Sequence, residues 1–206
     1  MKSKSYWEKV YAAKATTSVS WYQEHAECSL SLVRNTGITK SASIIDVGGG
    51  ASTLVDDLLA DGYSDVTVLD LSHAALSAAR QRLGARAAKV QWLEADVTDA
   101  GLPIHRYDLW HDRAVFHFLT DLQQRQAYVE TVFRSVKLGG HVIVATFAED
   151  GPTQCSGLPV MRYAANELHA QFGEAFALVK HVKEAHHTPS GSVQQFVYCY
   201  CRVLAS

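Results

Sequence analysis

The sequence predicts an α/β fold: a doubly wound, mainly parallel seven-stranded sheet with helices on both faces and a C-terminal antiparallel hairpin. Two observations lead to this prediction. Short apolar runs typical of buried strands alternate with segments whose apolar residues recur at helical spacing, which indicates right-handed crossovers between parallel strands. The last two strand-like runs stand too close together for a crossover, so one of them is expected to run antiparallel.

The first half of the alternation contains three strands and the two helices that connect them. The predicted strands are residues 43–47, 65–70 and 90–96. The first helix, 53–60, has an apolar stripe at helical spacing and is stopped by Gly62. Ser72 can accept a hydrogen bond from a free backbone N–H group at the start of the second helix, and Gly84 is suited to end it.

The second half continues the alternation and closes with the hairpin. The expected elements are a strand at 107–111, a helix at 121–136 that Gly139 and Gly140 end, a strand at 141–147, a short helix near 164–172 and strands at 176–184 and 194–204. The inward-facing residues expected on the 121–136 helix are Leu122, Val129, Val132, Phe133 and Val136.

Composition argues for one soluble domain and against several classes of partner. Hydrophobic residues make up 48% of the 206 residues and charged residues 19%, as in a globular protein with an ordinary core. The formal charge is −2, so no broad basic surface predicts a nucleic-acid or membrane partner. No apolar run approaches a membrane span and the start lacks a signal-peptide core, so a cytoplasmic protein is expected.

The cysteines and histidines do not form a predicted disulfide or metal site. The four cysteines have neither zinc-site spacing nor the density of a disulfide framework. Cys199 and Cys201 alternate in a strand-like run, so they are expected to pack, reduced, on one face of the sheet. His186 and His187 are adjacent and would face opposite ways on a strand, and no third ligand has a suitable spacing. We therefore expect no metal.

The stretch SIIDVGGGAST at 43–53 places three glycines directly after the first strand. Ligands of an open parallel sheet bind beyond the carboxyl ends of the strands, and glycines let a ligand approach the backbone closely. A phosphate-binding P-loop needs a Gly-Lys-Ser/Thr ending, which is absent here. A dinucleotide fingerprint fits Gly48 and Gly50 but finds Thr53 where a third glycine belongs. Asp46 would repel a pyrophosphate and attract a cation.

Acidic residues stand at the ends of the next two strands as well. Asp70 ends the second strand, where an acid commonly accepts hydrogen bonds from ribose hydroxyls. Asp96 ends the third in LEADV, where it could accept from an adenine amino group while the backbone of Val97 contacts the ring. One such acid is usually a helix cap or turn residue, but three on successive strands favour a shared ligand. S-adenosylmethionine, a cationic nucleoside without phosphate, suits them best.

The segments IIDVGGGAS, VTVLDLS, LEADVTD, YDLWHDRAVFHFL and KLGGHVIVATF follow one another along the chain. In this order they resemble the motifs of the class I (seven-strand, Rossmann-like) S-adenosylmethionine-dependent methyltransferases. The resemblance covers about residues 40–147, and the C-terminal hairpin agrees with it in outline. Ser52 departs from the pattern, because many members have a third alternate glycine there. We expect a helical lid segment at 1–40 and the S-adenosylmethionine-binding methyltransferase domain at 41–206, within a single domain overall.

The resemblance implies how the strand ends hold the donor. It assigns the methionine part to Asp46, Gly48, Gly49 and Gly50, the ribose to Asp70 with Leu71 beside it, and the adenine to Asp96 and Val97. The implied reaction is in-line displacement of the methyl group onto an oxygen, nitrogen or sulfur atom of a small molecule. Two alternatives stay open: a protein lysine as acceptor, or a protein that binds S-adenosylmethionine without catalysis. A monomer or homodimer is expected.

Two histidines and two loop residues are candidates for the acceptor side. His111 and His117 follow the fourth strand in HDRAVFHF, where acceptor and methyl group would meet, so either could act as a general base. The alternatives are that His111 lines the donor pocket and that His117 packs in a helical turn. Arg162 and Tyr163 lie in the irregular stretch after the fifth strand, which could recognise the acceptor or only connect two elements.

The N-terminal segment contributes several aromatic residues. Trp21 and Tyr22 precede the first strand and would lie over the site if this segment folds back as a lid. There they could attract a sulfonium through cation–π interaction and exclude water, or simply pack the lid onto the sheet. For Trp7 and Tyr11 packing is the expected role.

Overall fold

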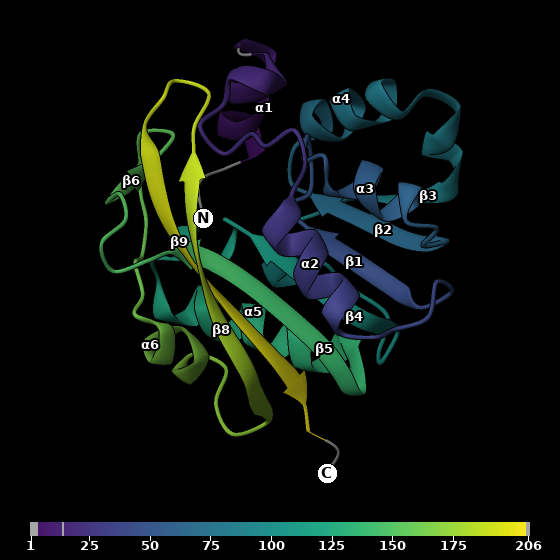
Figure 1. Cartoon of the computed structure of the whole chain (residues 1–206), viewed down its shortest axis with the longest axis vertical. Coiled ribbons are helices and arrows are strands. Elements are labelled where there is room, and N and C mark those ends of the chain that lie inside the picture. Colours follow the sequence, from purple (N-terminus) through teal and green to yellow (C-terminus); the bar gives the residue numbers. More distant parts are fainter. Residues whose placement is uncertain (1–3, 14, 205–206) are drawn as a thin grey trace.

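The computed structural model describes residues 4–13 and 15–204, which form one seven-stranded sheet with helices on both faces (Figure 1). Its strands are β1 (Ser43–Val47), β2 (Asp65–Asp70), β3 (Val90–Glu94), β4 (Tyr107–Arg113), β5 (Val136–Phe147), β8 (Phe176–His187) and β9 (Val193–Val203). Their order is β3-β2-β1-β4-β5-β9-β8; β9 runs antiparallel to β5 and β8, and the other pairs are parallel. The predicted fold and its hairpin are confirmed. The expected segments also include residues 1–3, 14 and 205–206, which lie outside the described residues.

Two helical layers bury the sheet. One face is covered by α2 (Glu27–Asn35), α3 (Leu54–Ala60) and α4 (His73–Leu83), and the other by α5 (Leu122–Ser135) and α6 (Ala165–Ala170). Neighbouring strand residues supply opposite layers: Ile44 packs with the first set of helices and Ile45 with the second. Cys199 and Cys201 both pack on the α5 side, as expected of alternate residues, and both are free thiols.

The N-terminal segment folds back over the carboxyl ends of the strands. Helix α1 (Lys4–Ala13) lies against α4, and the short 3₁₀ turn η1 (Thr16–Ser18) follows it. The carboxylate of Glu8 accepts hydrogen bonds from the backbone N–H groups of His73 and Ala74 in the first turn of α4. Lys4 also pairs with Glu94 at the end of β3. Two charged side chains thus attach α1 to the strand–helix unit on which it rests.

The expected junction between α5 and β5 is wrong. The helix ends at Ser135 and the strand begins at Val136, so Gly139 and Gly140 lie within the strand. Pairing of β5 with β4 starts at Tyr107 and Val136, and the register shifts before Leu109 pairs with His141. Gly139, with φ +74°, helps the chain to pass between the two registers. Pairing of β5 with β4 therefore ends the helix earlier than Gly139 and Gly140 predict.

Two other expected details also differ. The third strand stops at Glu94, because Asp96 begins a short 3₁₀ turn, η3 (Val97–Asp99). On α5 the expected core residues Leu122 and Phe133 are 58% and 39% exposed. The buried residues of that helix are Tyr128, Val132 and Ser135, so its inward face is rotated relative to the predicted stripe.

A small second sheet follows β5. It is formed by strands β6 (Gln154–Cys155) and β7 (Leu158–Pro159) and is separate from the main sheet.

A carboxylate is buried in the core after β4. Asp112 accepts hydrogen bonds from the backbone N–H groups of Val115 (2.8 Å) and Phe116 (3.1 Å) and from the Tyr128 hydroxyl (2.6 Å). Burial raises the pKa of Asp112 to about 6 in spite of these donors. The turn after β4, η4 (Phe116–Phe118), therefore depends on a carboxylate held between sheet and α5.

Asp112→Ala is expected to lower the free energy of unfolding by about 3 kcal/mol or more, because it leaves two backbone N–H groups and a hydroxyl buried without an acceptor. Tyr128→Phe is the matched control; it keeps the ring, removes one hydroxyl and should cost about 1–2 kcal/mol. Urea denaturation followed by circular dichroism measures both losses. Equal losses in the two variants would contradict a central role for the carboxylate.

Candidate functional site

Two adjoining cavities open at the carboxyl ends of β1, β2 and β4, where the strand order reverses. We call the first the β2 cavity; residues that line it include Leu69, Asp70, Leu71, Ala95, Val97 and Val115. We call the second the α2 cavity; residues that line it include Ser29, Asp46, Gly49, Thr53 and His111. Tyr11, Trp21, Val47, Gly48 and Arg113 line both. The two spaces therefore meet over the glycine loop.

The glycine loop rests directly on two buried carboxylates. A Cβ atom at position 49 would overlap the carboxylate of Asp46, and one at position 50 would overlap that of Asp70. Gly48 has φ +67°, a conformation that side chains of L-residues rarely adopt. The sequence needs glycine at all three positions for these local reasons. The result is a cavity wall of bare backbone backed by negative charge.

Asp70 is a buried acid at the edge of the β2 cavity. Burial raises its pKa to about 7, and the nearby charges of Asp46 and Glu8 act in the same direction. Hydrogen bonds from the backbone of Ser72 (2.7 Å) and Gly50 oppose this increase. A cation, or a ligand that donates hydrogen bonds to this carboxylate, would favour its ionised form.

The two carboxylate oxygens of Asp46 have different surroundings in the part of the chain that the structure describes. Its Oδ1 lies 2.7 Å from Nδ1 of His111, the residue paired with it in register on the neighbouring strand β4. Its Oδ2 is buried and has no hydrogen-bond partner in the described part of the chain. The other ring nitrogen of His111, Nε2, lies 2.8 Å from the Ser29 hydroxyl on α2. His111 thus supports the wall of the α2 cavity, because its two ring nitrogens contact Asp46 and Ser29.

Aromatic residues from α1 and the segment after it cover the β2 cavity. Trp7 lies edge-on to Phe118, with ring centroids 5.1 Å apart, and Trp21 lies edge-on to both Trp7 and Tyr11 at 6.2 Å. All four rings line the cavity. Burial, and then the charge of Asp70, raise the pKa of Tyr11, which keeps its hydroxyl neutral. Trp7 and Tyr11 therefore take part in the cavity wall as well as in packing, and their i, i+4 spacing on one helix face is the sequence signal for it.

The two residues expected near the adenine, Asp96 and Val97, have different positions relative to the β2 cavity. Val97 and Ala95 line the β2 cavity, whereas Asp96 is not among its lining residues. The Asp96 carboxylate accepts hydrogen bonds from the backbone N–H (3.0 Å) and hydroxyl (2.7 Å) of Thr98 and so begins the η3 turn. In this geometry the chain around Asp96 faces the cavity while its side chain fixes the turn.

His117 lies apart from both cavities. It is fully buried, its ring packs against Phe118 and Phe147, and its Nε2 has no hydrogen-bond partner among the described residues. Burial lowers its pKa to about 3, so the ring is neutral. This environment is that of a packed core histidine.

The predicted acceptor-side residues are not brought together. Tyr22 lines the α2 cavity beside Trp21, but neither Arg162 nor Tyr163 lines either cavity. Arg162 donates to the backbone oxygen of Gly151 at 3.1 Å. Tyr163 is buried in the core on the α5 side. Among residues 4–13 and 15–204, no group of three His, Cys, Asp or Glu side chains could hold a metal ion.

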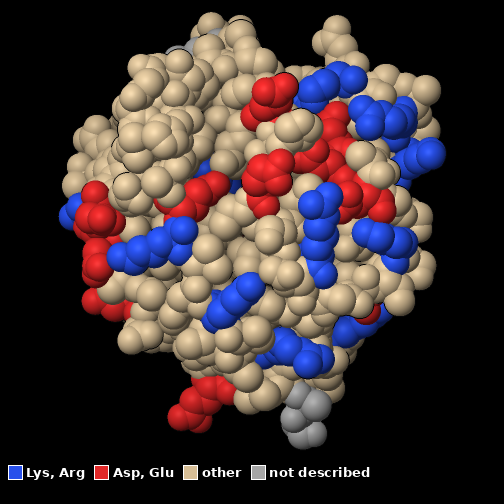
Figure 2. Space-filling view, in the orientation of Figure 1, with Lys and Arg blue, Asp and Glu red and all other residues tan. Residues whose placement is uncertain are grey.

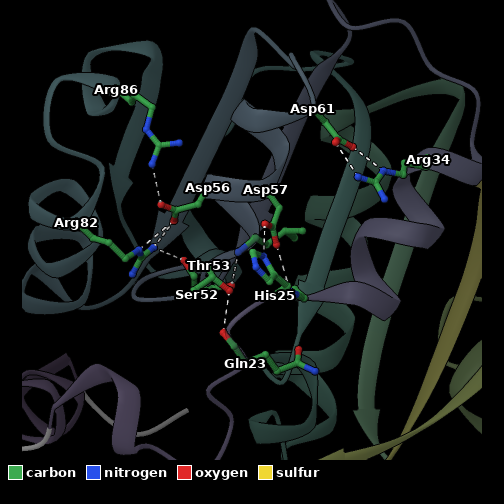
Figure 3. Close-up of polar contacts among 12 residues, drawn as sticks. Gln23, His25, Arg34, Ser52, Thr53, Asp56, Asp57, Asp61, Arg82 and Arg86 are labelled. Atoms are coloured by element: carbon green, nitrogen blue, oxygen red, sulfur yellow. Dashed lines mark hydrogen bonds and ion pairs between the residues drawn. The ribbon is translucent and has the colours of Figure 1, made fainter.

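The end of the glycine loop is held by an arginine from α4 (Figure 3). Arg82 donates to the backbone oxygens of Ala51 (2.9 Å) and Ser52 (2.6 Å) and pairs with Asp56 at 2.7 Å. Arg86 reaches the same carboxylate at 3.4 Å. Sequence reasoning did not identify this support, because it joins residues about thirty positions apart through side chains that are partly exposed.

The start of α3 is tied to the N-terminal segment in the same region (Figure 3). The Thr53 hydroxyl donates to the backbone oxygen of Gln23 at 3.0 Å. Asp57 contacts His25 at 2.8 Å and accepts a hydrogen bond from the backbone of Ala26 at 3.3 Å. Figure 2 shows acidic side chains near the upper centre of this face with Lys and Arg side chains around them. The α3 residues Asp56 and Asp57 thus belong to hydrogen-bonded networks that hold α3 in place beside the α2 cavity.

No helix in residues 4–13 and 15–204 combines the length and apolar character that a membrane crossing requires.

Comparison with known proteins identifies a methyltransferase domain within this chain. Residues 44–140 match the family model described as a methyltransferase domain. Among curated proteins, the eEF1A lysine and N-terminal methyltransferase of Mus musculus is 26% identical over 153 residues, which are 71% of this chain and 22% of that protein. The Homo sapiens protein of the same name is 25% identical over 153 residues, with the same coverage. The matched region thus spans about a fifth of the length of these curated relatives.

Solved structures have the same fold at low sequence identity. A protein from work on the conversion of a disulfide bond into a thioacetal group during echinomycin biosynthesis is 18% identical, with TM-score 0.77 and coverage of 98% of this chain and 92% of that one. The N-methyltransferase NodS from Bradyrhizobium japonicum WM9, in complex with S-adenosyl-L-homocysteine, is 16% identical with TM-score 0.72 and coverage of 98% and 99%. The chain therefore carries a methyltransferase domain at residues 44–140 and has the seven-strand, Rossmann-like fold of the class I S-adenosylmethionine-dependent methyltransferases.

Proposed function

We propose that the chain transfers the methyl group of S-adenosylmethionine, by in-line displacement, to an oxygen, nitrogen or sulfur atom of a small molecule. The observation that carries the proposal is the pair of buried carboxylates, Asp46 and Asp70, behind a cavity wall of bare glycine backbone. Two acids at one wall disfavour a phosphate and favour a cationic nucleoside. The Oδ2 of Asp46, which has no partner among the described residues, and the raised pKa of Asp70 both fit a ligand that brings positive charge and hydroxyl donors.

In this proposal the donor occupies both cavities. Its ribose hydroxyls donate to Asp70 beside Leu71, its adenine lies near Val97 and the backbone at Asp96, and its amino-acid end reaches Asp46 in the α2 cavity. The loop of Gly48, Gly49 and Gly50 admits the donor against the backbone. The support is that Val47 and Gly48 line both cavities, so that the two spaces adjoin at the glycine loop.

The donor supplies a methyl group already activated by its sulfonium, so the chain's tasks are alignment and exclusion of water. Trp7, Tyr11, Trp21 and Phe118 supply an apolar wall for this purpose. Neither predicted base offers a free nitrogen to the cavities: His117 is neutral and buried elsewhere, and both nitrogens of His111 have partners. These contacts support a positioning role for His111 and an acceptor atom that is nucleophilic without a strong protein base.

A protein amine is the second candidate acceptor. The observation in its favour is the likeness to eEF1A lysine and N-terminal methyltransferases, although the chain matches only 22% of their length. Against it, α1 covers the cavity, and Asp56 and Asp61 on the adjoining face are paired with Arg82 and Arg34. A protein that binds the donor without turnover is the third candidate, and the experiment below separates all three.

Incubation of the chain with methyl-labelled S-adenosylmethionine and a fractionated cell extract tests the acceptor. Label is expected in the small-molecule fraction, because the covered cavity favours a compact acceptor. Label in protein bands would support the second candidate. Donor binding by calorimetry without labelled product in either fraction would support the third, and binding of NAD in preference to S-adenosylmethionine would overturn the proposal.

Donor affinity is expected to increase as the pH rises towards 7 and to level off above it. The free chain holds Asp70 with a pKa of about 7, and a cationic donor favours the ionised carboxylate, so binding releases a proton below that pH. Asp70→Asn cannot ionise; it should bind the donor roughly tenfold more weakly and with a flatter pH profile. Asp99→Asn, an exposed turn residue, is the matched control. Calorimetry from about pH 5.5 to about pH 8 measures this. An unchanged slope in Asp70→Asn would remove this carboxylate from the site.

Tryptophan fluorescence reports on the lid without any assay of turnover. Of the four tryptophans, Trp7 and Trp21 line the β2 cavity, whereas Trp110 is in the core and Trp92 donates to the backbone of Ala87. Donor binding is expected to change the emission of the unchanged chain and of Trp92→Phe. The double variant Trp7→Phe, Trp21→Phe should lose most of that change, because its remaining rings are remote from the donor. A full response in the double variant would contradict the proposed cover.

A further inference from the structure

We propose that Ser29 and His111 are positioning residues that orient Asp46, so that its second carboxylate oxygen receives the α-ammonium group of the donor. This inference rests on the proposed function, since it names how the amino-acid end of S-adenosylmethionine is held. The inference gives a role to the hydrogen-bonded array of Ser29, His111 and Asp46, which methyl transfer itself does not require. Ser29, on α2, was not among the residues that the sequence singled out.

The three side chains form a linear array beneath α2. Asp46 and His111 are register partners on the neighbouring parallel strands β1 and β4, and both face the helix layer that contains α2. Asp46 Oδ1 lies 2.7 Å from His111 Nδ1, and His111 Nε2 lies 2.8 Å from Ser29 Oγ. Asp46 and His111 are each 2% exposed and Ser29 is 0% exposed. Water therefore does not compete for these bonds, and the array is set by the fold.

The chemistry of the array fixes the direction of its hydrogen bonds. An ionised carboxylate only accepts, so Nδ1 of His111 must carry the proton that faces Asp46. In the neutral ring Nε2 is then an acceptor, and the Ser29 hydroxyl is the donor at the right distance. Tyr198, 3.4 Å from Ser29 Oγ, donates its own hydroxyl proton to Glu184 at 2.9 Å. Ser29 thus selects the ring tautomer that Asp46 needs.

The array leaves one oxygen of Asp46 in place for a ligand. Because His111 holds Oδ1, the carboxylate cannot rotate freely and Oδ2 keeps a fixed position. That oxygen is buried without a donor in the described residues, which is costly unless a ligand supplies one. Gly49 has no side chain to cover it, since a Cβ there would overlap the carboxylate. An ammonium group supplies both the missing donor and the opposite charge.

The order Ser29, His111, Asp46 also matches the hydrogen-bond order of a nucleophilic triad. Ser29 is 0% exposed, as is expected of a hydroxyl that supports the imidazole ring rather than one that attacks a substrate. The array is therefore assigned to orientation of the carboxylate rather than to a second reaction.

The test compares two ligands that differ in the amino-acid end alone. Calorimetry measures the affinity of each variant for S-adenosylhomocysteine and for methylthioadenosine, which has the nucleoside and the sulfur but no amino-acid group. Ser29→Ala is expected to bind S-adenosylhomocysteine about tenfold more weakly, because one buried hydrogen bond is lost, and methylthioadenosine within about twofold of the unchanged chain. Ser135→Ala, a buried serine at the end of α5 that lines neither cavity, is the matched control.

A pair of His111 variants tests the same role independently of Ser29. The amide of His111→Asn can donate to Asp46 from a position close to that of Nδ1, so it should keep the preference for S-adenosylhomocysteine. His111→Gln carries its amide close to the position of Nε2 and should lose that preference about as much as Ser29→Ala does. Equal weakening of both ligands, or no weakening, in Ser29→Ala and His111→Gln would overturn the positioning role. Failure of the unchanged chain to bind either ligand would overturn the proposed function, and this inference with it.

Discussion

The close approach of bare backbone to two buried carboxylates is the constraint on which the site depends. Asp46 and Asp70 stand at the ends of neighbouring strands, and the glycine loop crosses directly over both. Any side chain at the loop's second or third glycine would collide with an acid. Buried carboxylates without compensating hydrogen-bond donors raise the free energy of the folded chain. A cationic ligand bound beside them would lower it. Charge and steric access are thus set by the same few residues.

Strand β4 distributes two polar functions to opposite faces of the sheet. His111 points towards α2 and holds Asp46, whereas its neighbour Asp112 points towards α5 and holds the turn that follows. Arg113, again on the α2 side, reaches Tyr198 and Glu184 of the C-terminal hairpin and the backbone of Trp21. The period of two in an extended chain therefore lets one short segment support the wall of the α2 cavity, the turn after β4 and the N-terminal segment together.

The fold was predictable where burial is uniform. Strands buried on both faces, such as Ser43–Val47, appear as short runs rich in apolar residues, and their spacing gives the crossovers. The cavity residues after β1 and β2 were predictable too, because the glycines and acids that form the wall directly follow those runs in the chain. The α5–β5 junction was missed because pairing with β4 overrides the local glycine signal. The roles of Ser29 and Arg82 were missed because they arise from contacts between distant segments, and no local pattern encodes these.

The carboxylate of Glu8 gives the N-terminal helix a second task beyond covering the β2 cavity. It completes the first turn of α4 by accepting from two backbone N–H groups that have no partner within that helix. Displacement of α1 would consequently remove these acceptors from α4 and uncover the β2 cavity together. Opening of the β2 cavity on this side is thereby coupled to the stability of the first turn of α4, the helix that connects β2 to β3.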